Sequence, residues 1–162
     1  MAKGNKIVVS VPPKGTFEEC IISGTPLPGT IMEPVPGAAT VGARMTYRAS
    51  TQPTGNRRGI CVLREDELQG VAPTVAYVAG TRGFLYWPAP GEELNCLAAI
   101  PGTGTGISGG AQVGERFIVG SNGILQPEVG SPAATPFFSI EAMPDISGQT
   151  SALVAVKYAG GQ

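Results

Sequence analysis

The sequence contains no histidine, and this absence removes a large part of enzyme chemistry. Nucleophilic systems of the Ser-His-Asp and Cys-His types need an imidazole base, and most zinc and copper sites need an imidazole ligand. Charged residues are also scarce, at 14% of the chain, and the formal net charge is −1. We therefore expect no catalytic activity, no cofactor, no metal, and no general electrostatic attraction to nucleic acid or to an anionic membrane.

Long apolar runs are missing as well. The N-terminal stretch MAKGNKIVVS has too few apolar residues for a secretory signal, and no other segment approaches the length of a membrane span. The three cysteines, Cys20, Cys61 and Cys96, are odd in number and far apart, so we expect buried free thiols rather than disulfides or metal ligands. Together these features predict a soluble protein made in a reducing cytosol.

Glycine and proline, by contrast, are abundant, with 24 and 15 residues. Short runs of β-branched and aromatic residues alternate with Gly/Pro turns, and no amphipathic helix longer than two turns stands out. This pattern predicts an all-β fold, an antiparallel β-barrel or sandwich of many short strands with long Gly/Pro loops. The expected strands are 7–11, 17–22, 43–49, 58–64, 74–78, 83–87, 94–100, 115–119, 124–126, 137–143 and 152–158.

The length and the loop signals predict a single domain over residues 15–162, preceded by an extended N-terminal arm over residues 1–14 with little means of packing on that domain. The segments 24–42 and 101–114 are expected to be long loops, and no repeat of fixed period is visible. Two short motifs predict local structure: REDELQG, residues 64–70, a single helical turn, and Asn122-Gly123 a hairpin turn.

No motif that carries chemistry has its required context. Residues 101–110, PGTGTGISGG, contain the G-x-G-x-x-G spacing of a dinucleotide-binding turn, but no helix follows to hold a phosphate, so we expect no nucleotide. The acidic runs at 18–19, 65–67 and 92–93 do not form acid–base pairs by themselves, because adjacent strand residues face opposite sides. Residues 65–67 also lack the ligand spacing of a calcium loop, and we expect a solvated turn there.

The stretch Phe84 to Trp87 carries large side chains on both faces of its expected strand. We interpret this strand as buried in the core or covered by another subunit, rather than as a stacking platform for bases or sugars. A carbohydrate-binding β-sandwich with exposed aromatics around Trp87 is the main alternative. A small hydrolase that uses two of the carboxylates is a second one.

Three stretches carry a family likeness: CVLREDELQGVAPTVAYVAGTRGFLYWPAPGEELNCLAAIPGTG, QVGERFIVGSNGILQPE and GSPAATPFFSIEAM. They resemble the capsid decoration, or cement, proteins of tailed bacteriophages, which are small all-β proteins on the outer surface of the icosahedral head. The likeness runs from about Phe17 to Met143 and is most distinctive over 63–70, 80–95 and 113–126.

The resemblance implies a viral structural protein that is made in the bacterial host cytoplasm and sits on the outer capsid surface of the virion. It implies a homotrimer that binds the major capsid protein through loops and an N-terminal arm, stabilising the capsid lattice. The expected capsid-contact residues are the basic and neighbouring side chains of the arm and of one loop: Lys3, Asn5, Lys6, Val8, Arg57 and Arg58.

Overall fold

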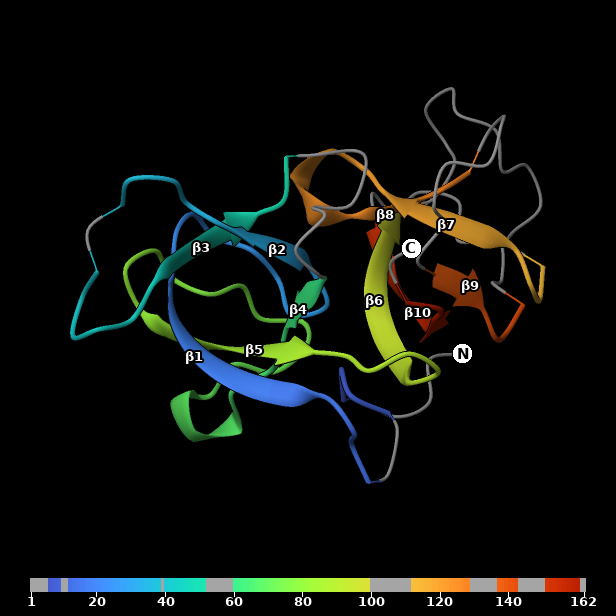
Figure 1. Ribbon diagram of the computed structural model, residues 1–162, viewed down its shortest axis with the longest axis horizontal. Coiled ribbons are helices and arrows are strands. Elements are labelled where there is room, and N and C mark those ends of the chain that lie inside the picture. Colours follow the sequence, from blue (N-terminus) through green and yellow to red (C-terminus); the bar gives the residue numbers. More distant parts are fainter. Residues whose placement is uncertain are drawn as a thin grey trace.

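The computed structural model describes residues 6–9, 12–38, 40–51, 60–99, 112–128, 137–142 and 151–160. Their regular structure consists of ten β-strands and two 3-10 helices, so the all-β prediction is confirmed. Figure 1 shows the strands in two groups that lie side by side, β1 to β5 and β6 to β10. The elements are β1 (Thr16–Ile22), β2 (Ile31–Pro34), β3 (Thr46–Ala49), β4 (Cys61–Leu63), η1 (Glu67–Gln69), β5 (Arg82–Trp87), β6 (Glu93–Ala99), β7 (Arg116–Val119), η2 (Ser121–Gly123), β8 (Leu125–Pro127), β9 (Phe137–Ser139) and β10 (Ser151–Tyr158).

Each group of strands closes into a five-stranded barrel. Barrel 1 has the strand order β1-β3-β2-β4-β5, and β5 closes it by pairing antiparallel with β1 from Thr16↔Trp87 to Ile21↔Arg82. Barrel 2 has the order β10-β6-β8-β7-β9, and its longest ladder joins β6 to β10 from Lys157↔Glu93 to Ser151↔Ala99. Closure leaves neither sheet with a free edge along these ladders, which protects a turn-rich β protein from edge-to-edge association.

The two barrels have the same connectivity. In each one the first strand pairs in parallel with the third and antiparallel with the fifth, and the second strand lies between the third and the fourth. The turns correspond as well, since a positive-φ glycine stands two residues before the second strand in both barrels, Gly29 at 88° and Gly114 at 85°. The sequence shows no repeat, so the duplication is visible only in the strand order and the turns.

A second pair of equivalent turns lies between the second and third strands. Gly42 and Ala43 in barrel 1 have φ of 57° and 62°, and Asn122 and Gly123 in barrel 2 have φ of 65° and 67°. Two consecutive left-handed residues match the twist of antiparallel strands and join them tightly. The predicted hairpin turn at Asn122-Gly123 is confirmed, because β7 and β8 pair antiparallel on either side of it.

Apolar side chains form two clusters, one inside barrel 1 and one that the barrels share. Strand alternation divides them: on β4, Val62 belongs to the shared cluster, whereas its neighbours Cys61 and Leu63 lie in the cluster inside barrel 1. On β5, Leu85 packs inside barrel 1, and Tyr86 packs toward barrel 2. The expectation that this strand is buried on both faces is confirmed at these two residues, and the second barrel of the same chain supplies the cover.

Two glycines allow the barrels to approach closely. A methyl group at Gly123 of barrel 2 would lie 2.1 Å from the Ile31 carbonyl oxygen of barrel 1. A methyl group at Gly29 of barrel 1 would lie 2.7 Å from the side chain of Leu153, where the Leu97 amide donates to the Gly29 carbonyl oxygen at 2.9 Å. Both positions have positive φ, so glycine satisfies the turn and the contact at once.

Two expectations about the elements are corrected. Residues 74–78 form no strand, and strand β2 lies inside the segment 24–42 that we expected to be a loop. The turn PAPGEE, residues 88–93, connects β5 to β6, which are not paired with each other, so this turn joins the two barrels and is not a hairpin. The helical turn expected in 64–70 is confirmed as η1, which ends at Gly70 with φ of 73°. No helix among the described residues has the length and apolar character needed to span a bilayer.

Residues 6–9 of the expected N-terminal arm pack on the domain. Val8 forms an antiparallel bridge with Leu94 of β6, the Asn95 amide donates to the Ile7 carbonyl oxygen at 2.8 Å, and the side chain of Ile7 is fully buried in the shared cluster. Residues 12–14 of the expected arm lead into β1, and the Lys14 amide donates to Glu92, whereas residues 1–5 and 10–11 lie outside the described residues. Residues 6–9 therefore act as an added strand of barrel 2 rather than as a free arm.

Candidate interaction surface

The buried carboxylates have structural hydrogen-bond partners. Glu92, 2% exposed, lies in the turn between the barrels and accepts hydrogen bonds from the Lys14 amide at 2.5 Å, the Tyr86 hydroxyl at 2.6 Å and the Ala89 amide at 2.6 Å. Burial by itself would raise the pKa of Glu92, but these donors hold the pKa below its usual value. The Glu92 carboxylate thus ties together the start of β1, the end of β5 and the turn.

Glu33 on β2 is used in the same way. Its carboxylate accepts hydrogen bonds from Arg48 Nε at 2.9 Å, Ser50 Oγ at 3.0 Å and Thr51 Oγ1 at 2.9 Å. Burial opposes ionisation, and these donors outweigh it, so the pKa of Glu33 is lowered. A carboxylate held ionised by three donors is a poor general acid, and this one joins β2 to β3.

The acidic run at 65–67 is a turn, as expected, but two of its carboxylates are not solvated. Glu65 is buried and accepts a hydrogen bond from the Ile7 amide at 3.1 Å, which fixes the added N-terminal strand to barrel 1. Asp66 is buried too, and its Oδ1 accepts from the amides of Leu68 at 3.1 Å and Gln69 at 3.3 Å. These bonds hold η1 in one conformation, with Leu68 at its tip.

The cysteines are buried free thiols, as the sequence predicts. Burial raises the pKa of Cys20 to about 12 and raises the pKa of Cys61 and Cys96 further. A thiol that stays protonated at neutral pH is a weak nucleophile, so these residues serve as small apolar side chains. Across the part of the chain that the structure describes, no three cysteine, aspartate or glutamate side chains gather as a metal site.

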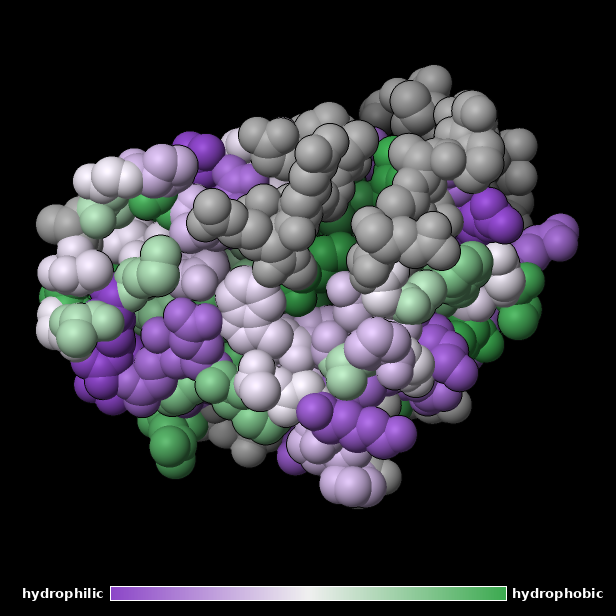
Figure 2. All heavy atoms as spheres, viewed as in Figure 1, coloured by the Kyte–Doolittle hydropathy of each residue, from purple (hydrophilic) through white to green (hydrophobic). Residues whose placement is uncertain are grey.

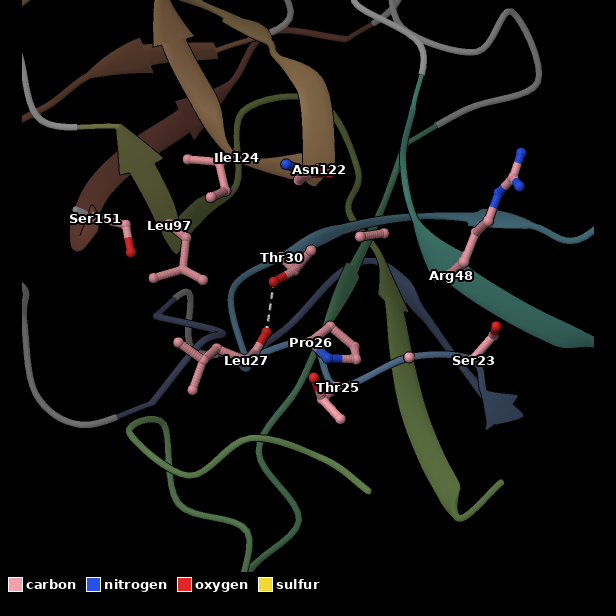
Figure 3. Close-up of a pocket in the computed structure, with 12 residues that line it drawn as sticks. Ser23, Thr25, Pro26, Leu27, Thr30, Arg48, Leu97, Asn122, Ile124 and Ser151 are labelled. Carbon is pink, nitrogen blue, oxygen red and sulfur yellow. Dashed lines mark hydrogen bonds between the residues drawn. The ribbon is translucent and has the colours of Figure 1, made fainter. Parts of the chain in front are cut away.

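A cleft of about 490 Å³ lies at the seam between the barrels. Figure 3 shows Pro26 and Leu27 on one side and Leu97 and Ile124 on the other, while Arg48 points away from the space between them. Arg48 Nε donates a hydrogen bond to Glu33. The hydroxyls and the amide that complete the lining offer no acid, base or nucleophile activated for catalysis. Its twelve lining residues are Ser23, Gly24, Thr25, Pro26, Leu27, Thr30, Arg48, Ala49, Leu97, Asn122, Ile124 and Ser151.

Among the described residues, most of the exposed large apolar side chains belong to barrel 1. Leu68 is 97% exposed at the tip of η1, and Figure 2 shows apolar side chains protruding at the edge where Figure 1 places the short green coil of η1. A single exposed apolar side chain is common on protein surfaces, but here the hydrogen bonds of Asp66 fix the turn that presents Leu68. The exposed large apolar residues described are Phe17, Val41, Met45, Leu68, Val75, Val78 and Val113, and all but the last belong to barrel 1.

A small pocket of about 280 Å³ lies beside Leu68. Its lining is Lys6, Arg64, Glu65, Asp66, Leu68 and Phe84, so the added N-terminal strand, β5 and η1 meet there. The Arg64 guanidinium carbon lies 4.9 Å from the centre of the Phe17 ring, a cation–π contact on the same face. We call this feature the Arg64 pocket.

The structure describes two of the six expected contact residues. Lys6 is exposed and lines the Arg64 pocket, whereas Val8 is half-buried against β6. Lys3, Asn5, Arg57 and Arg58 lie outside the described residues, as does the glycine-rich stretch 101–110. Arg64, Leu68 and Phe84 were not among the expected contact residues. One signal in the sequence pointed to this place, because a solvated turn does not need an apolar side chain and the polar run REDELQG contains a single leucine.

Trp87, the centre of the carbohydrate alternative, is not a free platform. Its ring packs against the cluster inside barrel 1, and its Nε1–H donates to Glu18 at 2.8 Å. Nothing in this geometry favours sugar stacking at Trp87. No protein-family model matches the chain, and no curated protein sequence matches it significantly.

Proposed function

We propose that this protein is a decoration protein of a tailed bacteriophage, which binds the outer surface of the icosahedral head as a trimer and stabilises the capsid lattice. The proposal starts from the sequence resemblance. The observation that carries it further is a set of six exposed large apolar side chains among the described residues of barrel 1, with Leu68 at the tip of η1 the most exposed. Exposed apolar side chains of this kind are expected where a partner covers them.

The described carboxylates and thiols support a binding role over a catalytic one. Glu33, Asp66 and Glu92 are consumed by hydrogen bonds that hold the fold, and the thiols are buried and protonated. The physical mechanism is linkage, because a protein that binds only the expanded lattice adds its binding free energy to that state. Repetition over many sites multiplies modest contacts.

The direct experiment mixes the purified chain with undecorated, expanded heads built from the major capsid protein of the phage that encodes it. Cosedimentation and electron microscopy are expected to show saturable decoration at regular lattice positions. Decorated heads should also release their DNA at a higher temperature than bare heads. Absence of binding, or binding without any gain in head stability, contradicts the proposed function.

A further inference from the structure

We propose that the Arg64 pocket receives an acidic side chain, carried on an extended capsid-protein segment whose neighbouring apolar residue packs on Leu68. This inference rests on the proposed function and assigns the contact to one place on barrel 1. The pocket volume of about 280 Å³ suits one or two side chains rather than a whole helix. The charged and apolar groups that line the pocket determine which side chains fit it.

Arg64 has donor capacity that the described part of its own chain leaves unused. Its nearest carboxylate contact, NH2 to Glu65 Oε1, is 3.7 Å long, which exceeds hydrogen-bond distance. Its Nε is buried, and no hydrogen-bond partner for it lies within the described part of the chain. A guanidinium presents a planar fork that matches a carboxylate, and the Arg64 side chain is 29% exposed, so an incoming aspartate or glutamate would pair with its terminal nitrogens rather than with the buried Nε.

Lys6 adds a second cation at the rim. Its ammonium group is exposed, and its backbone is fixed because the Lys6 carbonyl oxygen accepts a hydrogen bond from Asn95 Nδ2 at 2.6 Å. The pocket also contains the carboxylates of Glu65 and Asp66, but both are buried and bonded to backbone amides. Lys6 and Arg64 are thus the groups of the pocket that can attract an acidic side chain, while the formal charge of the four groups together is zero.

The zero net charge of the pocket predicts how the capsid segment is recognised. Long-range electrostatic attraction is weak, and the pocket distinguishes an acidic side chain from others through short-range hydrogen bonds to Arg64 and Lys6. The apolar part is supplied by Leu68 and the half-buried ring of Phe84. We therefore expect attachment to depend on an acidic residue next to an apolar one, and to fall only a few-fold between low and moderate salt.

Single substitutions on the heads assay test the assignment. Leu68→Asp is expected to weaken attachment at least tenfold, and Lys6→Glu several-fold, because each opposes one part of the predicted contact. The matched controls are Val113→Asp and Lys157→Glu, an exposed apolar residue and an exposed lysine of barrel 2, and both should bind within twofold of the unchanged protein. Circular dichroism and melting temperature check that all four variants fold.

Arg64→Lys provides a second, independent measurement. It keeps the positive charge and removes the planar fork, so attachment should weaken although the net charge is unchanged. Equal binding by Leu68→Asp, Lys6→Glu and the unchanged protein overturns the assignment while leaving the proposed function standing. Loss of binding in the barrel 2 controls alone overturns it as well. Failure of the unchanged protein to bind heads refutes the proposed function, and this inference with it.

Discussion

Replacing Glu92 by glutamine tests whether the buried carboxylate at the junction holds the two barrels together. In the native protein one carboxylate oxygen accepts from the Lys14 amide and the Tyr86 hydroxyl, and the other accepts from the Ala89 amide. A glutamine keeps a single acceptor oxygen. Its NH2 group must face at least one of these donors in a site where the native side chain is only 2% exposed.

The magnitude follows from the hydrogen bonds. Bonds to a charged acceptor are worth roughly 1.5–3 kcal/mol and bonds to a neutral one about 1 kcal/mol, so two retained bonds are weakened. The third is replaced by a donor facing a donor, which leaves a buried amide unsatisfied at a cost of about 1–3 kcal/mol. We expect Glu92→Gln to lower the free energy of unfolding by about 2–4 kcal/mol in total. For a chain of this size that corresponds to a fall in melting temperature of roughly 4–16 °C.

The pH dependence has a definite sign. The pKa of Glu92 is lowered in the folded protein from the ordinary value of 4.5, which the unfolded chain approaches. The stabilisation is therefore fully present above about pH 4.5 and is lost as the pH falls through the folded-state pKa. Because protonated Glu92 meets the same conflict as glutamine, the gap between the unchanged protein and Glu92→Gln should shrink in acid.

Urea denaturation measures both effects, followed by the fluorescence of Trp87, which is the sole tryptophan of the chain. Glu115→Gln is the matched control, since Glu115 accepts an exposed hydrogen bond from the Gln112 amide, and a change within about 0.5 kcal/mol is expected there. A cost below 0.5 kcal/mol for Glu92→Gln at neutral pH would refute the argument. A gap that stays constant down to pH 3 would refute its electrostatic part.

Three further results are expected. Gly123→Ala should lower the free energy of unfolding by at least about 2 kcal/mol, because the added methyl group clashes with Ile31 and the residue keeps a strained positive φ. Gly114→Ala has open space around it and should lower the free energy of unfolding by about 1 kcal/mol, from the strain of positive φ alone. Urea midpoints of the two variants separate the clash from the strain. The native protein should leave all three thiols unreacted with a thiol reagent until denaturant is added, and fast labelling without denaturant would contradict their burial. Ile7→Ala should cost about 2–5 kcal/mol, and an unchanged urea midpoint for this variant would show that Ile7 is not part of the core.

Local signals allowed much of the fold to be predicted from the sequence. The Asn122-Gly123 turn, the short turn in 64–70 and the all-β character depend on neighbours in the chain, and all three are confirmed. Strand β2 was missed because its four residues lie between prolines and glycines, and because only tertiary contacts make Ile31 and Met32 core residues. Pairing partners were harder still, since the tight turn after Trp87 has the composition of a hairpin but leads into a different barrel.

The candidate surface was predictable only in part, for a similar reason. Lys6 was found as a basic residue near the N-terminus, but its neighbours Arg64 and Phe84 come from segments about 60 to 80 residues away in sequence. Glu65 was expected to be solvated, because nothing local shows that the Ile7 amide needs an acceptor. A charged side chain can be buried when a distant segment of the chain supplies its hydrogen-bond partner, and a single sequence does not show which segment that is.

The duplicated strand order does not give two independent domains, because the shared cluster draws on both barrels. Ile31, Val62 and Tyr86 of barrel 1 pack with Leu94 and Phe117 of barrel 2. Separating the barrels would expose these side chains, and each fully buried one is worth roughly 1.5–3 kcal/mol, so the halves stabilise each other by an amount comparable to the whole stability of a small domain. The added N-terminal strand crosses the same boundary, since Ile7 pairs with β6 and is held by Glu65 of barrel 1. Barrel 2 thereby fixes the position of Lys6 at the Arg64 pocket and takes part in the surface that barrel 1 presents.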